Sequence, residues 1–391
     1  MKVVLAHRVL PHWRIPVFQR LADWPDIDFV ALHGSDFPGT KTLNAKDLSG
    51  FEHRKLFTLR LISKITGERE IAFPLWPSLP WHLWRERPDV VLTEGGSSLP
   101  NAFLLLATTW LLRIPVVWWT LGEIPHPQPL SFSQRLFRTL VRFLERRCVA
   151  YLGFSSMARE YFQRCGYSRE SQFVAVNCVD TDAVEWRRPD ARAQADALRT
   201  RLGLVGKRVL LFVGALAPYK RVEDLILVYA RLRKRHPDLR LLIVGGGNHQ
   251  EVLEDYADEV DAKEVTFTGE VIEGVGPFFE VGDVLVLPGL GGLAISEAMT
   301  HGLPIVATLA DGCEADLIQE GANGHVLAAG DTEQLESRLE ALLADPDRIQ
   351  RMGERSRAII EHEHNINTYM ENLVAALHYA GELGTQQDRE Q

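Results

Sequence analysis

Short, largely apolar runs, separated by segments long enough for a helix, limit the possible folds of this chain more than any other feature. They occur at Val3–Ala6, Val90–Thr93, Val116–Trp119, Arg208–Val213 and Leu239–Val244. A strand with one solvated face alternates polar and apolar residues, whereas a strand of a parallel sheet with helices on both faces is apolar throughout. The sequence therefore predicts an α/β fold built on parallel sheets.

The runs form two series, and 391 residues suffice for two domains of ordinary size. A polar stretch at 180–207 lies between the series, and we place the boundary near residue 184. We expect two Rossmann-like, doubly wound domains facing a central cleft, over 1–184 and 185–365, then a helix over 366–381 that returns to the first domain and a polar tail over 382–391. Because open α/β sheets bind ligands at the carboxyl ends of their strands, the cleft is the expected ligand site.

Charged residues divide unevenly between the two halves. Residues 1–184 hold 22 basic and 17 acidic side chains and eight of the nine tryptophans, whereas the whole chain has 43 basic and 52 acidic side chains. The formal net charge of -9 argues against nucleic acid as a partner, since nucleic-acid binding relies on excess positive charge. The uneven division indicates that the two halves face different partners.

The four cysteines, Cys148, Cys165, Cys178 and Cys313, lack both CxxC spacing and a nearby cluster of histidines. We therefore expect reduced thiols, no metal site and a cytoplasmic protein. The first residues do not resemble a signal peptide, since charged residues and prolines interrupt their apolar run. The most apolar segment, residues 102–112, is well short of the ~20 residues that cross a bilayer, so we expect a buried helix there.

Two cations follow the first strand of the second series. That strand ends at Gly214, and Lys220 and Arg221 come immediately before the next helix. A helix start already offers free amide groups, so two cations beside it suit a diphosphate. A solvated Lys-Arg pair next to Glu223 is an equally reasonable interpretation of these residues alone.

A glycine-rich loop follows a later strand. Gly289, Gly291 and Gly292 precede Leu293 and a helix that carries Glu297 in its first turns. Backbone N–H groups in such a loop point toward an anion, and a carboxylate at Glu297 is placed to accept hydrogen bonds from a ribose diol. The alternative is an ordinary helix-stabilising glutamate, and a glycine loop by itself is a weak signal.

Taken in order, these motifs resemble those of a known enzyme family. The Lys-Arg pair, VGGG at 244–247, FTGEV at 267–271 and SEAMTHGLPIVAT at 296–308 resemble the C-terminal domain of family 4 retaining glycosyltransferases with the GT-B fold. Upstream, VNCVD at 176–180 resembles the segment between the family's two domains. HWRIPVF at 12–18 is similar to the start of a bacterial subgroup that builds surface polysaccharides. The resemblance covers about residues 1–375.

The resemblance implies a role for each matching residue. Lys220 and Arg221 would hold the donor diphosphate and Glu297 the nucleotide ribose, and these three are the predicted catalytic residues. The predicted donor-binding residues are Gly214, Gly289, Gly291, Gly292, Leu293 and Glu270, the last of them near the base. Position 289 departs from the family, which has there a glutamate that contacts the donor sugar.

The implied activity is transfer of a sugar from a UDP- or GDP-linked donor to a hydroxyl of a glycan or lipid-linked glycan, with retention and without a metal or other cofactor. The DTD sequence at 180–182 has the letters of a metal-binding motif, but we interpret it as a turn and helix cap. Gly289 leaves open a catalytically impaired partner protein that binds the nucleotide-sugar in a polysaccharide assembly. A nucleotide-sugar epimerase or an inverting transferase is the other alternative.

The acceptor-side candidates are His12, Arg14 and Glu123, although a cap or loop carboxylate is the simpler reading of Glu123. Residues 131–148 combine apolar residues at helical spacing with five arginines, Arg135, Arg138, Arg142, Arg146 and Arg147. Such a helix suits an anionic membrane surface, which would place the protein on the inner face of the membrane as a peripheral protein. A helix that packs its apolar stripe on the sheet is the alternative.

Overall fold

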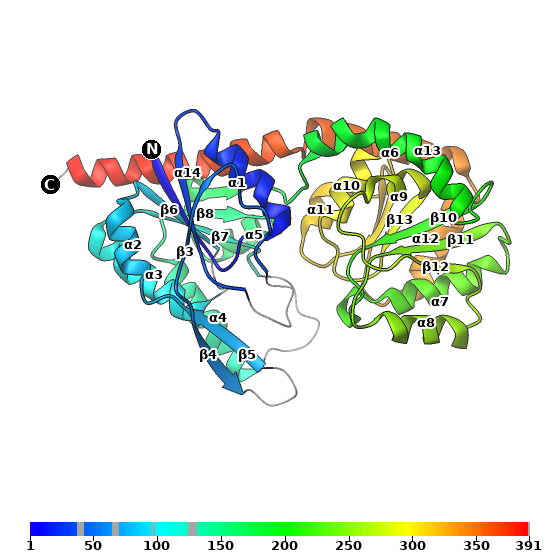
Figure 1. Cartoon of the computed structure of the whole chain (residues 1–391), viewed down its shortest axis with the longest axis horizontal. Helices are drawn as coiled ribbons and strands as arrows, with labels where there is room; N and C mark the ends of the chain where they lie inside the picture. Colours follow the sequence, from blue (N-terminus) through cyan, green and yellow to red (C-terminus); the bar gives the residue numbers. More distant parts are fainter. Residues whose placement is uncertain (37–42, 65–69, 95, 97, 124–130, 390–391) are drawn as a thin grey trace. The chain divides into compact units, whose positions relative to one another are not determined.

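The computed structural model describes residues 1–36, 43–64, 70–94, 96, 98–123 and 131–389 (Figure 1). The chain divides into two compact units. Unit 1 consists of Met1–Ala175 and Met370–Gln391, and unit 2 consists of Val176–Tyr369. The chain thus enters unit 2 at Val176, whereas the sequence suggested a boundary near residue 184.

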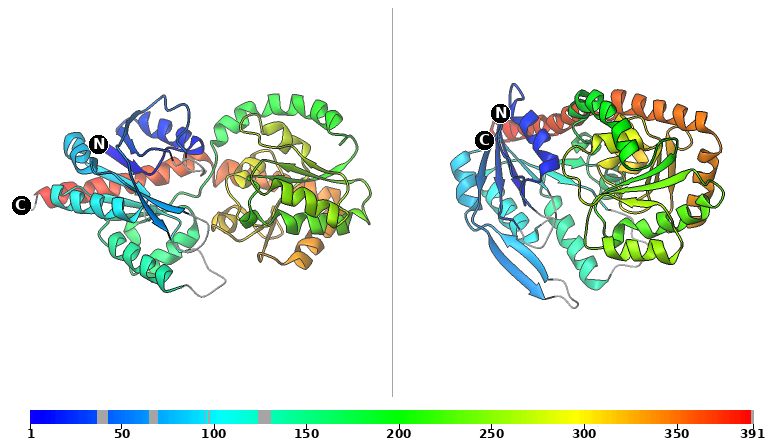
Figure 2. Two further views of the ribbon diagram at one scale, coloured as in Figure 1. Left: turned by 60° about the horizontal axis from the view of Figure 1, so that its bottom comes forward. Right: turned by 45° about the vertical axis from the view of Figure 1, so that its right-hand side comes forward.

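Unit 1 is built on a seven-stranded parallel sheet with the strand order β3-β2-β1-β6-β7-β8-β9. Its strands are β1 (Lys2–His7), β2 (Asp28–His33), β3 (Glu52–Lys55), β6 (Val90–Glu94), β7 (Val116–Thr120), β8 (Ala150–Gly153) and β9 (Gln172–Val174). An antiparallel hairpin of β4 (Leu59–Lys64) and β5 (Glu70–Leu75) projects from the sheet (Figure 2). The helices are η1 (His12–Arg14), α1 (Ile15–Ala22), α2 (Leu79–Glu86), α3 (Leu99–Leu112), α4 (Phe132–Glu145), α5 (Ser156–Arg164) and η2 (Arg169–Ser171).

Unit 2 is built on a six-stranded parallel sheet with the order β12-β11-β10-β13-β14-β15. Its strands are β10 (Arg208–Val213), β11 (Leu239–Val244), β12 (Val265–Phe267), β13 (Val284–Leu287), β14 (Ile305–Thr308) and β15 (Gly324–Leu327). Helices α7 (Val222–Arg233), α8 (Gln250–Glu259) and α12 (Thr332–Leu343) pack together beside this sheet. A second group comprises α6 (Thr181–Arg201), α9 (Gly276–Val281), α10 (Ala294–Thr300) and α13 (Pro346–His362).

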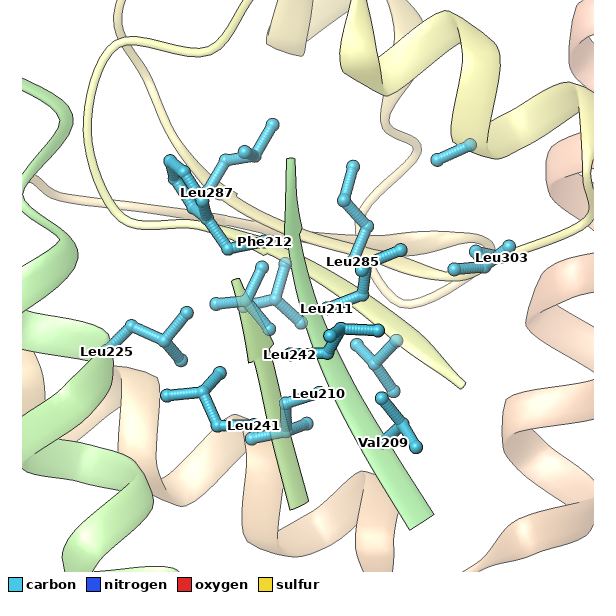
Figure 3. Packing of buried hydrophobic residues seen from close by; sticks show 14 of the residues in the cluster. Val209, Leu210, Leu211, Phe212, Leu225, Leu241, Leu242, Leu285, Leu287 and Leu303 are labelled. Carbon is cyan, nitrogen blue, oxygen red and sulfur yellow. The ribbon is translucent and has the colours of Figure 1, made fainter. Parts of the chain in front are cut away.

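Buried apolar side chains cover the faces of each sheet. Leu210, Leu211, Leu241 and Leu242, on the neighbouring strands β10 and β11, belong to the buried apolar core of unit 2 (Figure 3). In unit 1, β1 is buried from Val3 to His7, as the lack of alternation in its sequence predicted. The predicted class, two Rossmann-like parallel-sheet α/β domains, is therefore observed.

Some elements differ from the sequence-based expectation. The polar stretch after residue 180 forms the long helix α6. Only three apolar residues of this helix are buried, namely Ala191, Ala195 and Leu198. The polar tail is also helical, because α14 (Ile366–Arg389) continues past residue 381. It does so while packing on unit 1, where a side chain at Gly381 would lie 2.7 Å from Met1 Sδ.

The apolar segment 102–112 is helical, as expected, but it is not fully buried. It forms most of α3, whose Trp110 and Leu111 side chains are 77% and 75% exposed. The tryptophans before it also divide, since Trp76 is buried while Trp81 and Trp84 on α2 are exposed. All four cysteines are unbridged.

Candidate functional site

The topology of unit 2 singles out one edge of its sheet. From β10 the chain continues to β11 on one side, and it later returns to β13 on the other side of β10. The loops that follow β10 and β13 therefore leave neighbouring strands toward opposite sides. In open α/β sheets ligands bind at such a switch point, outside the carboxyl ends of the strands. The cations at 220–221 and the glycine loop, defined as residues 288–293, occupy these two loops.

Glycines allow the backbone segments that follow β10 and β11 to contact each other. A Cβ atom at Gly245 would lie 1.9 Å from the carbonyl oxygen of Gly214, and one at Gly247 would lie 2.1 Å from that of Leu216. The Leu216 amide also donates to the Gly246 carbonyl at 3.0 Å. Since any side chain would separate these loops, the VGGG sequence holds the loop after β10 against the end of β11.

Lys220 connects the two loops at the switch point. It ends the short helix η3 (Pro218–Lys220), and its Nζ donates to the carbonyl oxygens of Leu290 at 2.5 Å and Gly291 at 2.6 Å. The Leu290 amide in turn donates to the Tyr219 carbonyl at 3.1 Å. The two sequence motifs that were expected to share a site are thus in direct contact.

Arg221 points to a different neighbour. It stands before α7 in a left-handed conformation, with φ of 53°, and its Nε donates to Asp224 Oδ2 at 2.7 Å. A Cβ atom at Gly330 would lie 2.8 Å from one guanidinium nitrogen. The two adjacent cations therefore diverge, with Lys220 on the glycine loop and Arg221 on Asp224 and the loop that follows β15.

Gly289 is required by the packing of these loops. A Cβ atom there would lie 2.5 Å from both the carbonyl carbon of Lys220 and the carbonyl oxygen of Tyr219. These are backbone atoms, which cannot turn away as a flexible side chain can. A glutamate at position 289 would therefore push the glycine loop off Lys220, which explains the departure from the family in terms of local packing.

Glu297 lies on α10, directly after the glycine loop. Its carboxylate makes no hydrogen bond or ion pair with another residue that the structure describes, and burial raises its pKa to about 7, with Arg187 acting in the opposite direction. A partly buried acceptor without a protein donor is well placed to take hydrogen bonds from a ligand's hydroxyl groups.

Glu314 is a second carboxylate at this edge, and the sequence patterns did not single it out. It lies on α11 (Cys313–Leu317), where its Oε2 accepts from the Gly312 amide at 3.0 Å. Its Oε1 is buried and has no hydrogen-bond partner in the described structure, and a Cβ atom at Gly291 would lie 2.6 Å from it. Burial, together with Asp311, raises the pKa of Glu314 to about 6. In the sequence, Glu314 looks like any first-turn glutamate.

Glu270 and the VNCVD segment lie outside the contact between Lys220 and the glycine loop. Glu270 is exposed in the loop after β12, and its backbone amide would be 3.1 Å from a Cβ atom at Gly246. The VNCVD segment is tied to α10, because the Val179 amide donates to Ser296 Oγ at 3.0 Å. Asp180 caps α6 by accepting from the Ala183 amide at 3.2 Å, which confirms the turn-and-cap interpretation of DTD. Within the described ranges, no group of three His, Cys, Asp or Glu side chains could hold a metal ion.

The acceptor-side candidates of unit 1 lie in different surroundings. Arg14 is buried, with its guanidinium 4.6 Å from the ring centre of Trp119 and 4.7 Å from that of Phe154. His12 is exposed beside Trp13.

Glu123 is engaged in ion pairs within unit 1. It accepts from Arg138 and, at 3.2 Å, from Arg142, both on α4. Arg164 also lies within ion-pair distance, at 3.9 Å. Its observed contacts are those of a loop carboxylate that anchors α4.

Helix α4 exposes its apolar residues. Phe132 and Phe143 are 83% and 51% exposed, and only Leu144 and Glu145 of this helix are buried. The alternative in which the apolar stripe packs on the sheet is therefore wrong for most of the helix. A search of the described chain finds no helix with the length and apolar character needed to span a bilayer.

Comparison with known sequences gives one family model that matches within unit 2, and several similar proteins. Residues 195–359 match the family model described as "Glycosyl transferases group 1". The sulfoquinovosyl transferase SQD2 of Arabidopsis thaliana is 27% identical over 317 residues, which are 75% of this chain and 59% of the relative. A GDP-mannose-dependent phosphatidylinositol monomannoside mannosyltransferase of Mycolicibacterium smegmatis is 34% identical over 191 residues, which are 46% of this chain and 49% of the relative. The matched region thus spans about half of these relatives.

Comparison with solved structures covers nearly the whole chain. Anabaena HepE, solved in complex with UDP, matches with a TM-score of 0.75 and 17% identity over 96% of this chain and 99% of its own. WaaG, a glycosyltransferase involved in lipopolysaccharide biosynthesis, matches with a TM-score of 0.65 and 17% identity over 96% and 98%. These likenesses confirm the expected GT-B-type α/β fold. The match to the glycosyl transferase group 1 model is confined to residues 195–359, within unit 2.

Proposed function

We propose that this protein is a glycosyltransferase that moves a sugar from a nucleotide-sugar to an acceptor hydroxyl. The contact between Lys220 and the glycine loop, at the switch point of the unit 2 sheet, carries the proposal. Glu297 adds an unpartnered carboxylate directly after that loop, within the described structure. HepE, which shares the fold, has been solved with UDP and with UDP-glucose, and this supports a nucleotide-sugar as the donor.

The chemistry asked of this site is management of negative charge. When the sugar leaves, charge builds up on the nucleoside diphosphate, and fixed cations and amide groups stabilise it. In this proposal Lys220 and the amides of Gly291–Leu293 face the diphosphate, Arg221 assists from the start of α7, and Glu297 holds the ribose. We also propose transfer with retention and without a metal ion, as the family resemblance implies.

The acceptor is proposed to be a glycan or lipid-linked glycan, reached from a membrane surface. Exposed aromatic residues on α4 and the adjoining α3, among them Phe132, Phe143 and Trp110, support this proposal. The five arginines of residues 131–148 add positive charge beside them, and two of these arginines, Arg138 and Arg142, pair with Glu123. An exposed basic and aromatic helix fits the interface of an anionic bilayer, and the protein would then lie on its inner face.

A donor screen with a matched lysine control tests the donor site. UDP- and GDP-linked sugars are added to the full chain, and thermal stabilisation and release of nucleoside diphosphate are measured. One donor should stabilise the protein, and Lys220→Ala should weaken its binding at least tenfold. Lys234→Ala, which removes an exposed lysine at the end of α7, should leave binding unchanged. Equal affinity in the two variants would contradict the assigned role.

The same screen separates the alternatives. A pseudo-enzyme would bind the donor without measurable transfer or hydrolysis, and an epimerase would convert the donor sugar without an acceptor. The anomeric configuration of a transferred sugar, read by NMR, distinguishes retention from inversion.

Vesicle flotation tests the membrane surface. The wild-type chain should float with vesicles that contain phosphatidylglycerol and remain behind with phosphatidylcholine alone. The double variant Phe132→Ser and Arg135→Glu should lose most of this binding, while Trp186→Ser, which alters a 79% exposed aromatic residue of unit 2, should keep it. Equal flotation of all three proteins would remove α4 from the proposal.

A further inference from the structure

Unit 1 has a switch point of its own, at the centre of its sheet. The chain leaves β1 for β2 on one side and returns to β6 on the other, so β1 and β6 are neighbours at the point where the strand order reverses. The last residues of these two strands are His7 and Glu94. His7 Nε2 lies 3.0 Å from Glu94 Oε2, so a His–Glu pair spans this point, as Lys220 spans the corresponding point in unit 2.

Contacts at both ring nitrogens fix the position of the His7 side chain. His7 Nδ1 is in close contact with the carbonyl oxygen of Val9, which can only accept a hydrogen bond. The opposite ring nitrogen faces the Glu94 carboxylate, which when ionised can also only accept. The His7 ring is thus held between the Val9 carbonyl oxygen and the Glu94 carboxylate.

Two guanidinium groups act on the same carboxylate. Burial alone would raise the pKa of Glu94, but His7, Arg14 and Arg8 outweigh it and lower that pKa to about 2. Arg14 is held in place between Trp119 and Phe154, and Arg8 directly follows β1. The cluster therefore contains two guanidinium groups and one carboxylate, with the His7 ring beside the carboxylate.

Its members differ in how far they reach solvent. The side chain of Glu94 is 31% exposed and Arg8 is half-buried, whereas that of His7 is only 7% exposed and Arg14 is buried. A ligand would meet Arg8 and Glu94, with His7 and Arg14 behind them. The excess of guanidinium groups over carboxylates at this edge of the sheet favours an anion there, because buried charge is stabilised by an opposite charge.

We propose that Arg8, supported by His7, Glu94 and Arg14, binds an anionic group of the acceptor, a phosphate or a carboxylate. This inference rests on the proposed transfer function for the identity of the ligand, but the site itself lies entirely within unit 1. Arg8 is the contact residue, and His7 and Arg14 are positioning residues. The positive balance of residues 1–184, with 22 basic and 17 acidic side chains, favours an anionic partner for the same part of the chain.

Binding of pyrophosphate to the UDP-saturated full chain tests the site. UDP occupies the donor site and keeps the probe away from Lys220. Isothermal titration should detect pyrophosphate binding to the wild type, at least tenfold weaker binding to Arg8→Gln, and recovery of most of the affinity in Arg8→Lys. The control is Arg85→Gln, which removes a unit 1 arginine outside the cluster, 5.2 Å from the ring centre of Trp81, and this variant should bind as the wild type does.

Each outcome decides the matter. Lack of pyrophosphate binding by the UDP-saturated wild type, or equal affinity in Arg8→Gln, overturns the site. Loss in Lys220→Ala but not in Arg8→Gln would place the anion in unit 2 and also overturns it. If UDP itself fails to bind while pyrophosphate binds in an Arg8-dependent manner, the anion site stands and the proposed donor function fails.

Discussion

Replacement of Glu297 with glutamine is expected to stabilise the protein above pH 7 and to weaken its binding of a nucleoside diphosphate. Burial raises the pKa of the Glu297 carboxyl from 4.5 to about 7, so the folded chain binds this proton more tightly than the unfolded chain does. The resulting stability is complete below pH 4.5 and is lost as the pH rises through 7. At 1.36 kcal/mol for each pH unit, the loss is at most about 3 kcal/mol.

Glutamine has nearly the same shape and carries no charge, so Glu297→Gln should remove this loss. The gain in unfolding free energy should be near zero at pH 4, grow between pH 4.5 and 7, and level off at about 3 kcal/mol or somewhat less. For a unit of this size, that corresponds to roughly 6–12 °C in Tm. Urea unfolding of both proteins at a series of pH values measures the difference directly.

The same substitution should impair ligand binding. A hydrogen bond to a charged carboxylate contributes about 1.5–3 kcal/mol, so the affinity for UDP or the matching nucleotide should fall roughly tenfold to a hundredfold. A carboxylate that lowers the unfolding free energy but increases the affinity for the ligand behaves as a functional residue is expected to.

The alternative reading of Glu297 predicts the opposite sign. A helix-stabilising first-turn glutamate would lose about 0.3–1 kcal/mol when neutralised. Glu333→Gln provides the control, because Glu333 is an exposed first-turn glutamate on α12. If Glu297→Gln destabilises the protein as Glu333→Gln should, and leaves affinity intact, the reasoning about Glu297 is refuted.

Two further predictions concern the glycine loop and the metal. Gly289→Glu should destabilise the protein by about 1–3 kcal/mol and lower transfer, because a Cβ atom there lies 2.5 Å from backbone atoms of Tyr219 and Lys220; a Tm scan and a rate assay measure both effects, and faster transfer would contradict the packing argument. Transfer should persist in EDTA, since the proposed charge stabilisation comes from Lys220 and backbone amides; activity that is lost in EDTA and restored by Mg²⁺ would contradict it.

The parallel sheets were predictable because their signal is local. A strand buried on both faces is apolar along its centre, and β1, β10 and β11 each contain a run of at least four consecutive apolar residues. Helix α6 lacks such a signal, because only five of its 21 residues are buried. The short strands β3 and β15 are polar or bounded by glycine, so tertiary pairing alone defines them.

The donor-side residues were found by their order along the chain, but their geometry was not predictable. The sequence indicates that Lys220 and the glycine loop share a site, yet not that Nζ binds the loop's carbonyl groups. It marked Gly289 as a missing glutamate, whereas the structure gives it a steric reason. Glu314 and the His7–Glu94 pair have no motif, because only folding brings them to their partners.

The most direct test of the donor site is a crystal structure of the full chain with UDP. The account predicts that the diphosphate lies within hydrogen-bond distance of Lys220 Nζ and of amide groups in Gly291–Leu293, with a ribose hydroxyl on the Glu297 carboxylate. A nucleotide bound elsewhere, with Lys220 still on the carbonyl oxygens of Leu290 and Gly291 and the Glu297 carboxylate untouched, would contradict it.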